Sequence, residues 1–340
     1  MTITMIGIDI AKSVFHLHAT NHLGRQVKRK KLRRDQLLQF LAQVPACKIA
    51  MEACGSSHHW AREIQQLGHK VLLISPQYVT PFRLGNKNDY NDAQAIAEAA
   101  SRPQMRFVAI KSIEQQSILM LHRMRERLVK QRTALVNQTR GLLAEFGVVF
   151  PQGIHHFRAA IPYLLEDDDS DLTPMARESF ALLYEEFLFS DQQVKHVENQ
   201  IKAISEQSAV CNKLDEIQGI GELAATALYA SIGDATLFKN GRHLSAFLGL
   251  VPRHDGSGDK NILKGISKRG NGYVRTLLIH GARSVLRHSI NKSDPFSLWA
   301  NALRERRGFN KACVAIANNK LARYAWVVMS KDESFVSLTN

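Results

Sequence analysis

Four carboxylates stand in this sequence where an isolated acid is hard to explain. Asp9 lies inside the apolar run ITMIGID, and Glu52 ends the short run KIAME. Asp89 and Asp92 are three residues apart in NDYNDAQAIAEA, so a helix presents both on one face. A carboxylate in a buried strand is unfavourable unless a cation neutralises it. Because Mg²⁺ prefers oxygen ligands and a pair of ions can clamp a phosphodiester, we interpret the four acids as a site for two Mg²⁺ ions.

The two acids of the helix have a simpler alternative explanation. Negative side chains are favoured in the first turn of a helix by its dipole, which is sufficient for Asp89 and Asp92 taken alone. It does not explain Asp9, because the middle of an apolar strand has no use for an unpaired acid. The metal interpretation therefore depends mainly on Asp9.

A second candidate for chemistry is a serine in the segment GLVPRHDGSGDKNILKGISKRGNGYVRTLL. Ser257 stands between two glycines, which leave its hydroxyl uncrowded. A serine hydroxyl becomes a good nucleophile only when a base or a metal activates it. The alternative is a flexible Gly-Ser turn. Ser267, in GISKRGN, is a second possible nucleophile, which we interpret as a helix cap or a phosphate contact.

The charge of the chain favours a polyanionic partner. The formal net charge is +14 over 340 residues, although a merely basic protein remains an alternative. Residues 25–34 (RQVKRKKLRR) form either a solvated strand face or a strip that contacts a nucleic-acid backbone. The residues that we assign to nucleic-acid binding are Lys28, Arg29, Lys30, Lys31, Gly219, Gly221, Lys264, Lys268 and Arg269.

The sequence argues against a zinc site, a disulfide framework and a membrane span. The four cysteines are scattered without a CxxC pair, which argues against structural zinc and disulfides and fits a reducing cytoplasm. No apolar run is long enough to cross a membrane. His16 and His18 alternate on a predicted strand and lack zinc spacing, so we interpret them as structural or phosphate-adjacent.

The elements that must position the acids alternate between strands and helices. Strands are predicted over residues 3–9, 14–20, 25–34, 48–52 and 70–74, and helices over 56–67 and 89–100. This order predicts an α/β domain with a mixed sheet over residues 1–105.

The rest of the chain is predicted to be helical. Leu121, Leu128, Leu135 and Leu142 recur every seven residues, and a second stretch has coiled-coil spacing with Ser190 at one apolar position. Residues 106–212 are thus predicted to form a coiled-coil dimerisation region, whose helices pair with each other or with a second chain. Residues 213–340 are predicted to form a C-terminal domain with helix, glycine turn and helix, then a Gly/Lys-rich loop over 252–272.

Three motifs together resemble one family. The GIDIAK strand, the MEACG segment and the NDYNDAQAIAEA helix are similar to the RuvC-like (RNase H-like) domain of bacterial insertion-sequence DEDD transposases related to the Piv DNA invertase. The family tetrad matches Asp9, Glu52, Asp89 and Asp92 in order. The Ser257 segment resembles the C-terminal signature of this family, and IQGIG resembles the hairpin of helix-hairpin-helix DNA-binding modules.

The resemblance implies a function for the whole chain. It implies a recombinase that cuts and rejoins DNA through a covalent phosphoserine on Ser257, beside Mg²⁺ held by the tetrad. It also implies donor and target DNA, a structured non-coding bridge RNA and self-association as a dimer or tetramer as partners, in the bacterial cytoplasm at the nucleoid. The alternative is a RuvC-like nuclease of the Holliday-junction resolvase type, in which water replaces the serine.

Overall fold

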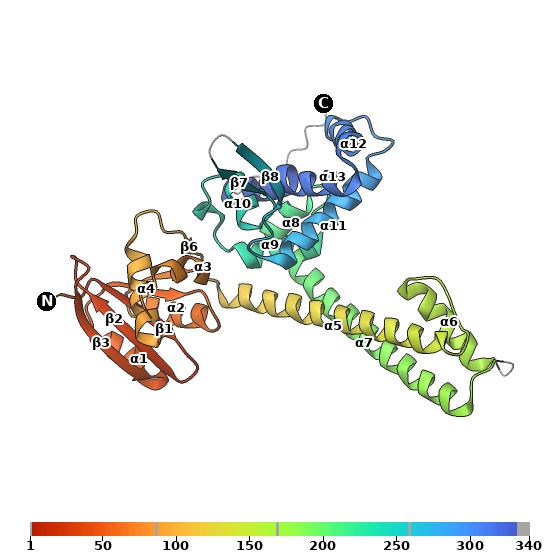
Figure 1. The fold of residues 1–340 in the computed structure, drawn as a ribbon, viewed down its shortest axis with the longest axis horizontal. Coiled ribbons are helices and arrows are strands. Elements are labelled where there is room, and N and C mark those ends of the chain that lie inside the picture. Colours follow the sequence, from red (N-terminus) through yellow and green to blue (C-terminus); the bar gives the residue numbers. More distant parts are fainter. Residues whose placement is uncertain (1, 86–87, 168–169, 258–259, 332–340) are drawn as a thin grey trace. The chain divides into compact units, whose positions relative to one another are not determined.

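The structure is a computed structural model that describes residues 2–85, 88–167, 170–257 and 260–331. The chain divides into two compact units, Met1–Ile113 and Glu114–Asn340 (Figure 1). Each unit has its own hydrophobic core.

The first unit is built on a six-stranded mixed sheet with the order β3-β2-β1-β4-β5-β6. The adjacent strands β1, β4 and β5 are parallel, and the other three pair antiparallel with their neighbours. The strands are β1 (Met5–Ile10), β2 (Val14–Thr20), β3 (Gln26–Arg33), β4 (Lys48–Glu52), β5 (Lys70–Ile74) and β6 (Phe107–Val108). The predicted mixed-sheet α/β domain is confirmed, and only the two-residue strand β6 was not predicted.

Helices cover both faces of this sheet. Side chains alternate along each strand, so Ile6 and Ile8 face the core under α1 and α2, whereas Met5 and Ala50 face α4. These helices are α1 (Leu37–Ala42), α2 (Ser57–Gln66) and α4 (Asp89–Ser101), with shorter turns η1 (Arg34–Gln36), α3 (Pro76–Val79) and η2 (Thr80–Phe82). Asp35 lies within η1 and pairs with Arg33 at 2.8 Å.

A glycine in β1 sets the distance between the sheet and α4. A Cβ on Gly7 would lie 2.2 Å from the carbonyl oxygen of Ala93 and 2.7 Å from the nitrogen of Ala97. Only a residue without a side chain allows this contact between backbones. Because Gly7 and Asp9 share a face of β1, the helix crosses the sheet beside Asp9.

The second unit begins with two long antiparallel helices, α5 (Ile113–Ala144) and α7 (Pro174–Gln207), joined through α6 (Ile154–Glu166) (Figure 1). Ion pairs join α5 to α7: Arg125 lies 2.6 Å from Glu198, and Arg132 lies 2.6 Å from Asp191. Within one chain, therefore, the two helices pair with each other.

The predicted leucine seam of α5 is wrong in detail. Of the four leucines only Leu135 is buried, and Leu142 is 45% exposed. The rest of the buried stripe of α5 consists of Gln115, Ile118, His122, Val136, Thr139 and Leu143. In α7 the buried residue is Asp191, which follows Ser190, the position predicted for the seam. The Asp191 carboxylate forms ion pairs with Arg132 of α5 and Arg158 of α6. A straight α-helix has 3.6 rather than 3.5 residues per turn, so over the three heptads from Leu121 to Leu142 a strict seven-residue repeat drifts off the buried face.

The remaining helices pack around one apolar core. They are α8 (Ala209–Asp215), α9 (Glu222–Ile232), η3 (Ala235–Leu237), α10 (Gly241–Phe247), α11 (Gly272–His288), α12 (Pro295–Arg307), α13 (Phe309–Ile316), η4 (Ala317–Leu321) and α14 (Ala322–Lys331). The predicted helix, glycine turn and helix correspond to α8, residues 216–221 and α9. In the part of the chain that the structure describes, no helix has the length and hydropathy needed to span a membrane.

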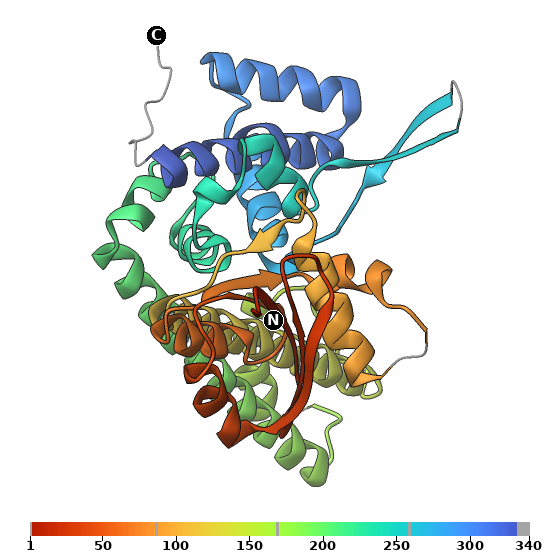
Figure 2. The ribbon, with the colours of Figure 1, turned by 90° about the vertical axis from the view of Figure 1, so that its left-hand side faces the viewer.

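The Gly/Lys-rich segment is not a loop throughout, as the sequence suggested. It contains a two-stranded antiparallel hairpin, β7 (Pro252–Ser257) and β8 (Lys260–Ile266), which projects from the helices of its unit (Figure 2). The register pairs Asp255 with Ile262 and Ser257 with Lys260. The residues Asn, Ile, Leu and Lys of β8 are compatible with a strand. The glycines on either side of them made the sequence resemble a loop.

Candidate functional site

Asp9 and Glu52 lie at the same edge of the sheet, on the same face. The parallel ladder of β1 and β4 pairs Gly7 with Ala50 and ends at Ile8 and Met51. The next residues along the two strands are Asp9 and Glu52, so both are at carboxyl ends of adjacent strands and face α4. Both side chains are half-buried.

The first turn of α4 brings the other two acids to this edge. Asn88 caps the helix by accepting a hydrogen bond from the Asn91 backbone N–H at 2.8 Å. Asp89 is exposed, and one ligand atom each from Asp9, Asp89 and His16 lie within 4.8 Å of one another. Asp92 is only 16% exposed and forms an ion pair with Arg83 at 2.7 Å. Among the described residues, Glu52 and Asp92 are not part of the 4.8 Å group.

His16 is a residue of this site that the sequence analysis missed. It lies directly opposite Asp9 in the β1–β2 register, and its Nδ1 is 3.4 Å from an Asp89 carboxylate oxygen. The interpretation as structural or phosphate-adjacent overlooked the hairpin, because a turn at residues 11–13 already implies that residues 9 and 16 face each other. The pairing register of the two strands indicates the position of His16, whereas the spacing of metal-binding residues along the sequence does not.

The thiol of Cys54 lies close enough to the acids for their negative charge to affect its pKa. Partial burial, together with the charges of Glu52 and Asp9, raises the pKa of Cys54 above its ordinary value. Cys54 therefore stays a thiol near neutral pH and is not a nucleophile. The two carboxylates of Asp9 and Asp89 and the imidazole of His16 form a donor set that fits a divalent cation.

The predicted basic strip is divided between the two faces of β3. Lys31 pairs with His16 and Arg29 with His18, so these two side chains share the face of the acids. Arg29 also donates a hydrogen bond to Gln94 of α4 at 2.9 Å. Lys28 and Lys30 point to the other face, where both lie over the ring of Phe40.

A basic hollow of about 600 Å³ lies at the turn between β1 and β2. Its lining includes Lys12, Arg33 and Arg34, and the Arg34 guanidinium lies 4.8 Å from the centre of the Trp60 ring. Because this turn directly follows the strand of Asp9, cations flank the acidic edge, as a polyanionic ligand would require.

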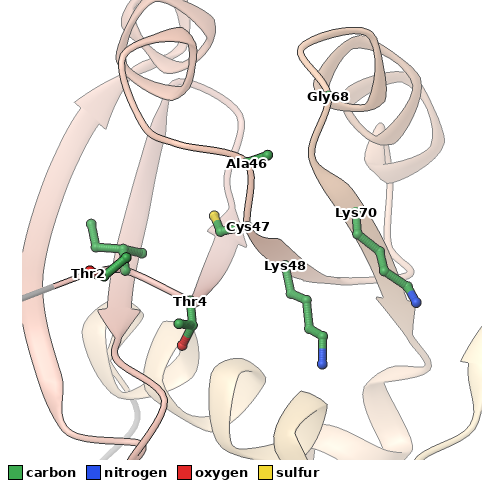
Figure 3. A pocket seen from close by; sticks show the side chains of 8 residues that line it. Thr2, Thr4, Ala46, Cys47, Lys48, Gly68 and Lys70 are labelled. Atoms are coloured by element: carbon green, nitrogen blue, oxygen red, sulfur yellow. The ribbon is translucent and has the colours of Figure 1, made fainter.

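The other large hollow of this unit is unrelated to the acids. It has a volume of about 410 Å³ and is lined by Thr4, Cys47 and Lys70 at the amino ends of the parallel strands, the edge opposite Asp9 (Figure 3). Beside it, the Cys47 backbone N–H donates to His69 Nδ1 at 3.2 Å. Burial raises the pKa of the Cys47 thiol to about 11, so this cysteine and histidine are not a catalytic pair.

Ser257 is the last residue of β7, next to residues 258–259, which lie outside the described part of the chain. Its backbone pairs with Lys260, and its side chain is not described. The rest of β7 is exposed, and Asp255 pairs with Lys264 across the hairpin.

The remaining predicted residues of the second unit occupy the base of the hairpin and a nearby turn. Ser267 is not a helix cap, because Asn271 caps α11 by accepting from the backbone of Tyr273 and Val274. Lys268 and Arg269 are exposed. Gly219 has a φ of +96°, and a Cβ on it would lie 2.6 Å from Val285, so packing alone already requires this glycine.

Comparisons with known proteins agree with this arrangement. Residues 6–148 match the DEDD transposase model of the IS110 group, described as "Transposase", and residues 211–297 match the model "Transposase IS116/IS110/IS902 family". The chain is 46% identical to the transposase for insertion sequence element IS1111A of Coxiella burnetii, over 98% of this chain and 91% of the relative. It is 39% identical to the transposase for insertion sequence element IS1328 of Yersinia enterocolitica, over 98% of each chain.

A more distant relative extends the comparison to DNA inversion. The pilin gene-inverting protein of Moraxella bovis is 22% identical over 98% of each chain. The mixed sheet with its edge of carboxylates, followed by a helical unit, thus defines a DNA transposase, an enzyme that binds DNA and depends on a divalent metal ion. The chain belongs to the IS110/IS116/IS902 family of insertion-sequence transposases.

Proposed function

We propose that this chain is a RuvC-like recombinase that cuts and rejoins DNA through a serine ester, with two Mg²⁺ ions at the acidic edge. The observation that carries the proposal is the meeting of Asp9, on the central strand, with Asp89, from the start of α4. The position of Glu52 at the end of the next strand supports a third ligand.

The acids would act together on the two ions. Asp9, Glu52, Asp89 and Asp92 supply only oxygen ligands, which suits Mg²⁺. Bound Mg²⁺ would neutralise the charge that develops on the phosphoryl oxygens. Asp92 would exchange its ion pair with Arg83 for an ion, which releases a guanidinium next to the site.

Ser257 is the proposed nucleophile. Its hydroxyl would lose its proton and bond to phosphorus as the 3′ oxygen leaves, so that the ester conserves the energy needed to rejoin the strand. Support comes from its place at the end of an exposed strand, across from Lys260. Ser267, at the base of the hairpin, is the alternative nucleophile. The acids and the serine that act on one phosphate could come from one chain or from two.

Nucleic acid would contact both units. On the first unit, Arg29 and Lys31 share the face of the acids and are the proposed contacts of the cleaved strand, and Lys28 and Lys30 would contact a second segment of nucleic acid. On the second unit, we assign this role to Lys264, Lys268 and Arg269, and to Gly219 and Gly221 as a helix-hairpin-helix turn. A structured bridge RNA that pairs with donor and target DNA is part of the proposal.

Self-association through the long helices is also proposed. Met175, Leu182 and Phe189 of α7 are exposed at seven-residue intervals, away from the buried stripe of the same helix. Exposed apolar side chains in such a row fit a coiled-coil contact with a second chain, giving a dimer that could pair into a tetramer. In this proposal residues 1–105, 106–212 and 213–340 are the metal, dimerisation and serine domains, and the assembly works in the cytoplasm, at the nucleoid.

Covalent trapping tests the proposal. The chain is incubated with Mg²⁺, guide RNA and end-labelled DNA, and DNA–protein adducts are separated under denaturing conditions. We expect an adduct that disappears in Ser257→Ala and persists in Ser267→Ala. Loss in Ser267→Ala alone would assign the nucleophile to Ser267. Cleavage by Ser257→Ala with free ends and no adduct would instead support the nuclease that uses water.

A further inference from the structure

One imidazole is positioned against the proposed metal site without an assigned role. His16 is on β2, directly opposite Asp9, and both side chains face α4. The ligand atoms of Asp9, His16 and Asp89 lie within 4.8 Å of one another, a spacing at which one ion can contact all three. Two of these residues come from neighbouring strands, and the third comes from the helix above them.

His16 is buried in a way that leaves one ring nitrogen unsatisfied. The residue is 6% exposed, and among the described residues its Nδ1 has no hydrogen-bond partner. That atom lies 3.4 Å from Asp89 Oδ2, close enough for attraction but not aligned as a hydrogen bond. A buried nitrogen without a partner is unfavourable unless something else, such as a cation, binds its lone pair.

The ring of His16 is also held in place. Tyr90, between the two acids of α4, packs against it edge-on with 4.7 Å between ring centres. A ligand whose orientation is fixed by packing loses little entropy when it binds an ion. Tyr90 thus holds the imidazole beside Asp9 and Asp89.

A second histidine on the same strand provides a natural control. His18 is two residues further along β2, on the same face and 5% exposed, and its Nδ1 is likewise unpartnered among the described residues. It lies opposite Gly7 rather than an acid, and it does not belong to the 4.8 Å group. Burial and the nearby Arg29 lower its pKa, so it is a neutral histidine next to a cation. The two histidines therefore differ chiefly in their proximity to carboxylates.

We propose that His16 Nδ1 is a direct ligand of the ion held by Asp9 and Asp89, which raises the affinity of this centre for Mn²⁺ relative to Mg²⁺. The inference rests on the proposed metal site. Imidazole nitrogen suits transition-metal ions, whereas Mg²⁺ favours ligand sets made only of oxygen. A site with two carboxylates and one imidazole accordingly binds Mn²⁺ more tightly, relative to Mg²⁺, than the same carboxylates alone.

The test measures the ion directly, without nucleic acid and without turnover. Mn²⁺ is bound to the full chain, and pulsed electron paramagnetic resonance records the hyperfine coupling of a directly bonded ¹⁴N. We expect this coupling in the wild type and in His18→Phe, and we expect His16→Phe to lose it. In competition titrations, His16→Phe should lower the ratio of Mn²⁺ to Mg²⁺ affinity about tenfold, whereas His18→Phe should leave it unchanged.

Two further results separate this inference from the proposed function. If Asp9→Asn abolishes Mn²⁺ binding while His16→Phe changes neither the ¹⁴N coupling nor the affinity ratio, the acidic site stands and the role of His16 is refuted. If Asp9→Asn leaves Mn²⁺ binding intact, the acidic site itself is refuted, and His16 with it. The circular dichroism spectrum of each variant confirms that it is folded, and His16→Gln replaces His16→Phe if the phenylalanine unfolds the unit.

Discussion

The two regions proposed to do chemistry are built in opposite ways. Asp9 and Glu52 lie on inner strands of a sheet that is covered by helices on both faces, and Gly7 fixes the position of α4, which carries Asp89 and Asp92. The hairpin of Ser257 is a two-stranded sheet, and its residues Ile262 and Leu263 are 54% and 62% exposed. A ribbon of two strands is only marginally stable in water.

This difference assigns different tasks to the two regions. The acidic edge is preorganised, because packing determines where its carboxylates and His16 lie before any ligand binds. The hairpin, in contrast, exposes apolar and basic side chains to solvent. Such a division suits an enzyme in which the metal site stays fixed and the nucleophile is positioned when nucleic acid binds.

The largest effect is expected at the fixed site. Asp9→Asn keeps the size of the side chain and removes the negative charge that lies on β1 next to Asp89 of α4. DNA strand cleavage should fall by about 10³-fold or more, because metal stabilisation of the phosphoryl charge amounts to several kcal/mol. Cleavage is measured in single turnover, and nucleic-acid affinity should change less than about threefold. An Asp9→Asn enzyme that cleaves at the wild-type rate would mean that the preorganised edge is not the catalytic site.

Acid should destabilise the helical unit that carries the hairpin. His122 is buried and bonds to Tyr273 at 3.0 Å and to Thr226 at 3.1 Å, and burial, with the charge of Arg125, lowers its pKa to about 4. Between pH 6.5 and about 4 the unfolded chain binds a proton at this histidine and the folded chain does not. Its contribution is therefore complete above pH 6.5 and is lost as the pH falls towards 4, by up to about 3 kcal/mol.

Urea unfolding at several pH values measures this loss. The free energy of unfolding of the second unit should fall between pH 6.5 and 4.5 in the wild type, and the fall should be smaller in His122→Gln. Equal slopes in the two proteins would show that His122 already titrates normally in the folded state.

Two glycine substitutions compare the packing of the two regions directly. Gly7→Ala places a Cβ 2.2 Å from the Ala93 carbonyl oxygen, so strand or helix must shift, at a cost of about 1–3 kcal/mol. Gly265→Ala, in β8, meets no atom within 4 Å and should change the stability by less than about 0.5 kcal/mol. Thermal unfolding of each variant measures both effects, and a hairpin glycine as sensitive as Gly7 would contradict the contrast.

The smallest effect concerns which face of β3 serves the acidic site. Arg29→Ala with Lys31→Ala should slow cleavage by about tenfold, whereas Lys28→Ala with Lys30→Ala should slow it less, although both pairs remove two charges from one strand. The salt dependence of DNA binding should weaken similarly in both. If the two double variants cleave at the same rate, the basic strip acts through its net charge rather than through one face.

The acidic edge could be largely predicted from the sequence because its information is local. Asp9 and Glu52 lie on strands, and Asp89 and Asp92 lie on a helix, whose predicted bounds agree with the structure to within about two residues. Parallel strands align their carboxyl ends, which places the first two acids at one edge. His16 was missed because its role depends on register, a pairing between residues that no single motif displays. The division of the basic run between two faces was missed for the same reason.

The second unit was less predictable because its contacts are long-range. The leucine repeat predicted only Leu135 of the buried stripe in α5. That stripe also contains His122, and an ion pair between Arg132 and Asp191 joins α5 to α7. In residues 252–266 the glycines suggested a loop, although β7 and β8 pair across them. Charged partners 59 residues apart leave no periodic signal in either helix.

The most direct test of the central claim replaces one non-bridging oxygen of the scissile phosphate by sulfur. Mg²⁺ binds sulfur poorly, and Mn²⁺ accepts it more readily. If ions held by Asp9 and its neighbours contact this phosphate, one of the two sulfur stereoisomers should be cleaved about 100-fold more slowly in Mg²⁺ and recover in Mn²⁺. Equal rates in Mg²⁺ for the oxygen substrate and both stereoisomers, in single turnover, would contradict the claim that metal at this edge acts on the broken bond.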